Sequence, residues 1–132
     1  MQKPSRETIL TLYFLDPETN SLKSEGKLVD SNILLDNPYK LIVQSLIDGP
    51  KSETLKSVFP ENTRILNATL TKNCVTLDFS EEILNYTDDT HKYNIINSIL
   101  NSLTQLTEVN SIKFLVNGSQ NDKFNEEYSA IY

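Results

Sequence analysis

Three side chains of the kinds used in hydrolysis lie between residues 78 and 91. Asp78, Ser80 and His91 supply a carboxylate, a hydroxyl and an imidazole, which together could activate a nucleophile for acyl transfer. Ser80 does not lie in a Gly-x-Ser-x-Gly elbow, the turn that exposes such a nucleophile in many hydrolases. We therefore predict that the chain is not an enzyme, that Ser80 caps the following turn, and that His91 is exposed near the start of a helix.

Acidic side chains gather in the same region and could in principle bind a cation: Asp78, Glu81, Glu82, Asp88 and Asp89. Calcium needs several oxygen ligands from a defined loop, and the spacing of an EF-hand is absent. The single cysteine, Cys74, and the single histidine exclude zinc sites built from several thiolates or imidazoles. With three glycines, the chain cannot form a GxGxxG or GxxxxGK[ST] phosphate loop. We predict no cofactor, no metal and a solvated acidic surface.

Charge and length narrow the remaining classes of function. The 132 residues contain 12 Lys and Arg against 18 Asp and Glu, a net charge of −6 that argues against nucleic-acid binding. The length suits one compact domain. No apolar run approaches the ~20 residues of a membrane span, and no signal-type apolar segment follows Met1–Arg6. The sequence leaves two options, a cytosolic protein or a chain whose leader has been removed.

The first predicted strand is apolar on both faces. Over Thr8–Asp16, the side chains of Leu10, Leu12 and Phe14 share one face, and those of Ile9, Tyr13 and Leu15 share the other. This pattern predicts a strand that is covered on both sides. A turn follows, and residues 21–35 are predicted as a hairpin or an extended arm that could cover the second face.

Two amphipathic helices and a hairpin follow along the chain. The first helix begins near Asp36-Asn37-Pro38 and ends at Gly49-Pro50, and the second begins near Asp88-Asp89-Thr90. Between them, a two-residue turn at Lys72-Asn73 would place six apolar side chains on one face. The predicted pairs are Leu70 with Val75, Ala68 with Leu77, and Leu66 with Phe79.

A last strand is predicted over Ser111–Val116, and Asn117-Gly118 forms the turn after it. The order β, arm, α, β, β, α, β predicts an α+β two-layer sandwich, with two helices on one face of a mixed, mostly antiparallel sheet. We assign residues 1–7 to a leader remnant or linker, 8–118 to the domain, and 119–132 to a tail that Tyr128, Ile131 and Tyr132 could dock.

Five short motifs follow one another along the chain: Leu12-Tyr13-Phe14, Gly49-Pro50, Phe59-Pro60-Glu61-Asn62-Thr63, Leu77-Asp78-Phe79-Ser80 and the segment from Val109 to Val116-Asn117-Gly118. In this order and spacing, they resemble the GerM domain of sporulation and spore-germination proteins and bacterial envelope lipoproteins. The resemblance covers about Thr11 to Gly118. Asn62 and Lys72-Asn73 depart from the family pattern, which often has Gly at the first place and an acidic residue with Gly at the second. Asn tolerates positive φ, so both departures are compatible with the fold.

The resemblance implies a non-enzymatic module outside the cytoplasmic membrane, similar to the ring-building domains of sporulation channels. It implies partners among envelope or sporulation proteins, including further copies in a ring, and a signal or lipid anchor before Met1. The structural motif residues would be Gly49, Pro50, Pro60, Asp78, Ser80 and Gly118.

The second face of the first strand is the predicted interaction face. Ile9, Tyr13 and Leu15 need cover, either from residues 21–35 or from another protomer, and an unpaired strand edge could also recruit a partner. The alternative function is a sensor or binding module for a small envelope ligand or a peptidoglycan fragment, which would require a pocket with convergent polar groups.

Overall fold

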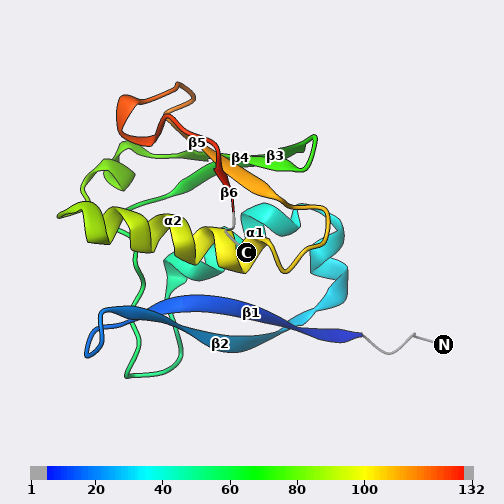
Figure 1. Ribbon diagram of the computed structural model, residues 1–132. Coiled ribbons are helices and arrows are strands. Elements are labelled where there is room, and N and C mark those ends of the chain that lie inside the picture. Colours follow the sequence, from blue (N-terminus) through cyan, green and yellow to red (C-terminus); the bar gives the residue numbers. More distant parts are fainter. Residues whose placement is uncertain (1–5, 130–132) are drawn as a thin grey trace.

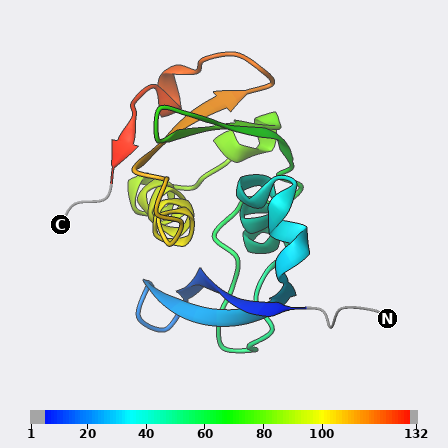
Figure 2. The ribbon, with the colours of Figure 1, turned by 90° about the vertical axis from the view of Figure 1, so that its right-hand side faces the viewer.

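The computed structural model describes residues 6–129, which form three layers (Figure 1). Two helices form the middle layer, a four-stranded sheet lies on one side of them, and a two-stranded hairpin lies on the other, as the perpendicular view also shows (Figure 2). The elements are β1 (Glu7–Asp16), β2 (Ser21–Asp30), α1 (Pro38–Asp48), β3 (Ile65–Thr71), β4 (Cys74–Phe79), α2 (Asp89–Leu103), β5 (Ser111–Val116) and β6 (Tyr128–Ser129). Short 3₁₀ turns lie at η1 (Ser31–Leu35), η2 (Glu81–Leu84) and η3 (Asp122–Phe124).

The α+β class is confirmed, with two helices on one face of a mixed, mostly antiparallel sheet. The sheet has the order β3-β4-β5-β6, in which β4 and β5 run parallel and the other neighbours run antiparallel. The hairpin adds a third layer to the two that were predicted. The reason is that residues 21–30 pair with β1 along its whole length, so these two strands form a sheet of their own on the far side of the helices.

The starts of both helices and the end of α1 follow the predicted capping signals. The Asn37 side chain accepts a hydrogen bond from the backbone N–H of Lys40, and Gly49 ends α1 with φ of 95°. The Asp88 carboxylate accepts a hydrogen bond from the N–H of His91 at 2.8 Å and so begins α2. These bonds satisfy donors that a helix N-terminus would otherwise leave unpaired.

The β3–β4 hairpin has the predicted turn, because Lys72 and Asn73 have φ of 49° and 65°. The pairs Leu70–Val75 and Ala68–Leu77 are confirmed, but the pair Leu66–Phe79 is wrong. A register irregularity between Ile65 and Asn67 places Ile65 opposite Phe79 instead. One extra residue in a strand turns the following side chains to the other face, so Leu66 is 39% exposed whereas Ile65 is buried.

The segment after Gly118 packs on the four-stranded sheet. Phe124 is 1% exposed and stacks on Phe114, with 4.6 Å between the ring centroids. Tyr128 pairs with Ile112 through β6 and meets Phe114 edge to face. The division of the chain at residues 7 and 118 stays a prediction, and residues 1–5, together with Ile131 and Tyr132 of the predicted tail, lie outside the described residues.

Candidate interaction surface

The three candidate catalytic side chains form separate structural hydrogen bonds. Asp78 Oδ1 accepts from the N–H of Gly118 at 2.8 Å, which fixes the turn after β5. Ser80 Oγ accepts from the N–H of Arg64 at 2.9 Å, and the Ser80 N–H donates to the Arg64 carbonyl at 2.9 Å. The side chain of Ser80 makes no capping hydrogen bond to η2, so the predicted cap is wrong. The Ser80 hydroxyl oxygen instead accepts from the N–H of Arg64, the residue before β3. A hydrogen bond from Ser80 is the main cause that lowers the pKa of Glu82.

His91 is half-buried rather than exposed, because it bridges two loops. Its Nε2 lies 2.6 Å from the Val58 carbonyl oxygen, and its Nδ1 accepts from the N–H of Thr87 at 3.0 Å. A carbonyl can only accept and an N–H can only donate, so the two bonds select the neutral tautomer with hydrogen on Nε2. The imidazole therefore ties the start of α2 to the loop at Val58.

The motif residues of the GerM resemblance lie at turns and strand ends. The Pro60 carbonyl accepts from the Thr63 N–H at 3.3 Å and from its hydroxyl at 2.7 Å. Asn62 in this turn has φ of 66°, and Gly118 has φ of 80°. Asn62 thus adopts the conformation for which glycine is common, as expected from its short polar side chain. Gly49 and Pro50 lead out of α1, and no part of this set forms a reactive cluster.

Metal binding has no support in the described part of the chain. Within residues 6–129, no group of three or more His, Cys, Asp or Glu side chains is placed to hold a metal ion. Two of the predicted acidic residues, Asp78 and Asp88, accept backbone hydrogen bonds from Gly118 and His91.

The predicted interaction face lies on the outside of the β1–β2 hairpin, exposed at Ile9 and half-buried at Tyr13 and Leu15. We call the apolar residues there the hairpin outer face: Ile9, Tyr13, Leu15, Leu22 and Leu28. Ile9 and Leu28 are cross-strand neighbours that are 65% and 59% exposed, while the other three are half-buried. The predicted cover of this face is therefore wrong at Ile9 and partial at Tyr13 and Leu15, of which Leu15 packs against the edge of the core. β2 lies beside β1 rather than over it, and a pairing strand covers an edge and not a face.

The other edge of β1 is closed by polar side chains of α2 and the turn beyond it. Ser98 Oγ donates to the Tyr13 carbonyl at 2.6 Å, and the Tyr13 N–H donates to Ser102 Oγ at 3.2 Å. The Gln105 side chain donates to the Thr11 carbonyl and accepts from the Thr11 N–H, at 2.8 and 3.1 Å. Positions 98, 102 and 105 recur at helical spacing, so these side chains replace a neighbouring strand. The sequence analysis did not predict this role for Ser102. The feature that could have indicated it is the pair of small polar residues, Ser98 and Ser102, beside the apolar stripe of the helix.

We predict that Ser98→Ala lowers the free energy of unfolding by about 1–3 kcal/mol, because the carbonyl of the half-buried Tyr13 loses the hydroxyl donor that the buried Ser98 supplies. Guanidinium unfolding monitored by circular dichroism measures this. Asn97→Ala, one residue away on the exposed side of α2, is the matched control and should not destabilise the domain. Equal stability of the two variants would contradict the closure of β1 by α2.

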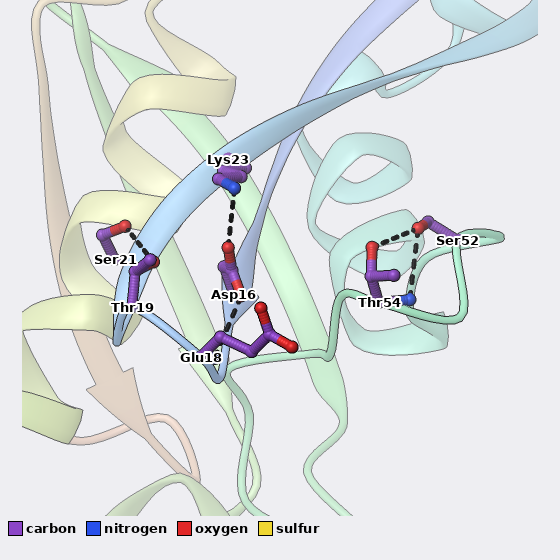
Figure 3. Close-up of polar contacts among 7 residues, drawn as sticks. All are labelled: Asp16, Glu18, Thr19, Ser21, Lys23, Ser52 and Thr54. Atoms are coloured by element: carbon purple, nitrogen blue, oxygen red, sulfur yellow. Dashed lines mark hydrogen bonds and ion pairs between the residues drawn. The ribbon is translucent and has the colours of Figure 1, made fainter.

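The turn of the hairpin is fixed by an ion pair (Figure 3). Asp16 accepts from Lys23 Nζ at 2.7 Å and from the N–H of Glu18 at 3.0 Å, and the hydroxyls of Thr19 and Ser21 lie 2.7 Å apart. The Lys23 hydrogen bond lowers the pKa of Asp16 below 3.8, and the same bond raises the pKa of Lys23 above 10.5. The pair therefore stabilises the hairpin between these values, and this contribution fades as the pH falls below the first or rises above the second.

The comparisons with known proteins agree with this geometry. The Germane family, described as "Sporulation and spore germination", matches residues 11–122. The chain belongs to this family. The GerM resemblance is thereby confirmed, although no curated protein matches the chain. Within residues 6–129, no helix has the length and hydropathy needed to cross a bilayer.

Three solved structures share the fold of this Germane domain. The tandem GerMN domains of the Bacillus subtilis sporulation protein GerM match 98% of this chain, with a TM-score of 0.73 and 24% identity. The chain spans 46% of the length of that solved chain. The first GerMN domain of the same protein matches 95% of this chain and 94% of its own length, with a TM-score of 0.72 and 21% identity. A candidate lipoprotein of Clostridium perfringens matches 98% of this chain and 93% of its own, with a TM-score of 0.66 and 20% identity.

Proposed function

We propose that this Germane domain is a non-enzymatic assembly module that acts outside the cytoplasmic membrane in bacterial sporulation or germination. It binds other envelope or sporulation proteins through the hairpin outer face. The observation that carries this proposal is the exposed cross-strand pair Ile9–Leu28, on a hairpin whose β1 strand buries the side chains of its opposite face. Apolar side chains grouped on one exposed face are typical of docking surfaces.

The location outside the membrane rests on the relatives. A lipoprotein-type relative with the same fold supports an anchor before Met1 in the full-length protein, with this domain as the part beyond the membrane. The family description supports the setting of sporulation or germination. Docking rather than chemistry is favoured because Asp78, Ser80 and His91 are each engaged in a separate structural bond.

Recognition of a small ligand or a peptidoglycan fragment, the alternative function, has less support. An open depression of about 290 Å³ lies beside β5 and the segment before β6. Glu127 at its rim is paired with Lys113 at 3.7 Å and accepts from the Ser111 hydroxyl at 3.0 Å. These polar groups bind one another instead of converging on a free site, as ligand binding would require.

The test is performed on the full-length protein in sporulating cells. The double variant Ile9→Thr, Leu28→Thr removes apolar surface from the hairpin outer face while keeping residues that favour strands. We expect loss of localisation with envelope partners and a fall of about tenfold or more in partner recovery after cross-linking. Leu35→Thr, at a leucine that is 82% exposed outside the hairpin, is the matched control and should change neither. Unchanged localisation and recovery in the double variant would overturn the proposal.

A further inference from the structure

The outer edge of β2 presents unpaired backbone groups. Thr11, Tyr13 and Leu15 of β1 direct their N–H and C=O groups away from β2, toward α2 and Lys56. In an antiparallel pair, residues opposite these also direct their backbone groups outward. On β2 they are Leu22, Ser24, Gly26 and Leu28. Within residues 6–129, no hydrogen bond to the N–H or C=O of these four residues is present.

β2 extends beyond the cover that the helices provide. Both helices contact β1 more extensively than β2. The β2 side chains on the helix side of the hairpin are accordingly charged, and they are Lys23, Glu25 and Lys27. Ser24, Gly26 and Leu28 are exposed, so another strand can reach this edge. A long unpaired edge of this kind is a template for strand addition.

We propose that a second copy of this chain pairs antiparallel with β2, on a two-fold axis at Gly26. The proposal deepens the proposed function, on which it rests, by naming one partner of the hairpin. Pairing about Gly26 places Glu25 opposite Lys27 of the second copy, twice by symmetry, and Ser24 opposite Leu28 of the second copy. The two hairpins then form one four-stranded sheet, and their outer faces become continuous.

The alternating charges select this register. An axis at Glu25 would place Glu25 opposite Glu25 and Lys23 opposite Lys27, and directly opposed like charges destabilise strand pairs. An axis at Ser24 would pair Glu25 with Lys23, which already binds Asp16 at 2.7 Å. Within residues 6–129, Lys27 makes one side-chain bond, from Nζ to Ser45 Oγ at 3.3 Å, and its ammonium keeps further donors for the second copy. The Glu25 carboxylate accepts from the N–H groups of Lys51 and Ser52 at 2.9 Å each, and both oxygens can accept a further bond. The axis at Gly26 is therefore favoured.

Sedimentation equilibrium and amide hydrogen exchange on the 132-residue chain test this pairing. Because the paired edges bury less than a standard interface, the range should span about 10 µM to 1 mM. We expect dimers at the upper end, with exchange at Ser24, Gly26 and Leu28 slowed about tenfold or more relative to the lower end. A monomer at the highest concentration, with these amides unprotected, would overturn the proposal.

Two variants test the edge and the register. Ser24→Pro removes an outward N–H without removing a bond to β1, and should abolish the dimer, whereas Ser24→Ala keeps the N–H and should dimerise normally. Lys27→Glu should weaken the dimer about tenfold or more by opposing two glutamates. A folded Ser24→Pro variant that still dimerises would overturn pairing at this edge. If that variant does not fold, the hydrogen exchange of the wild-type amides determines whether this edge is paired. Failure here leaves the assembly proposal to be judged by the Ile9 and Leu28 variants in cells.

Discussion

Ile65→Ala is expected to lower the free energy of unfolding by about 2–5 kcal/mol, while Leu66→Ala costs less than about 1 kcal/mol. Ile65 lies in the core opposite Phe79, and truncating it leaves a cavity that the neighbouring side chains cannot fill. Leu66 is turned to the surface by the register irregularity, so its truncation removes little buried area. Urea unfolding of both variants, with the midpoint and slope fitted separately, measures the difference.

Leu77→Ala provides the reference for a full core truncation at the centre of the same hairpin. Leu77 is completely buried opposite Ala68, so its loss should also cost about 2–5 kcal/mol. If Leu66→Ala destabilised the domain as much as Leu77→Ala, Leu66 would face the core. The regular pairing of Leu66 with Phe79 would then be correct and the irregularity would be absent.

The sequence predicts the local features of this fold well, because their causes are local. The helix start at Asn37-Pro38 and the turn at Lys72-Asn73 depend on side chains that satisfy or tolerate their own backbone. The two central pairs of the β3–β4 hairpin follow from the turn and from strict alternation. The irregularity at Leu66 does not follow, because Ile65 and Leu66 are both large and apolar, and either could fill the core.

The features that the sequence does not predict depend on distant partners. Ser98 and Gln105 close the edge of β1 from more than 80 positions along the chain, and their residue types are equally compatible with an exposed helix surface. The apolar second face of β1 was expected to need cover, and within the described residues the structure leaves it exposed at Ile9 and half-buried at Tyr13 and Leu15. The two-sided apolar pattern identified Ile9, Tyr13 and Leu15 as a candidate face, but strand periodicity carries no information about which molecule covers it.

Phe124→Ala is expected to lower the free energy of unfolding by about 3–5 kcal/mol, although this residue lies in a polar segment that we assigned to a tail. Its ring is 1% exposed, stacks on Phe114 and meets Tyr86 edge to face at 5.7 Å. A single aromatic residue among polar neighbours forms no periodic pattern, so the sequence does not predict that it is buried. Its burial depends on packing against Phe114 of β5 and against Tyr86. Thermal unfolding followed by calorimetry measures the loss.

Lys123→Ala is the matched control, since this side chain lies over the Tyr86 ring at 5.7 Å but remains exposed. We expect a loss of less than about 1 kcal/mol, the value of an exposed cation–π contact. If Phe124→Ala were equally mild, the domain would be stable without residues 119–129 and its boundary would lie at Gly118. A loss of several kcal/mol would instead show that the stacking of Phe124 on Phe114 stabilises the domain. Residues 119–129 would then belong to the domain.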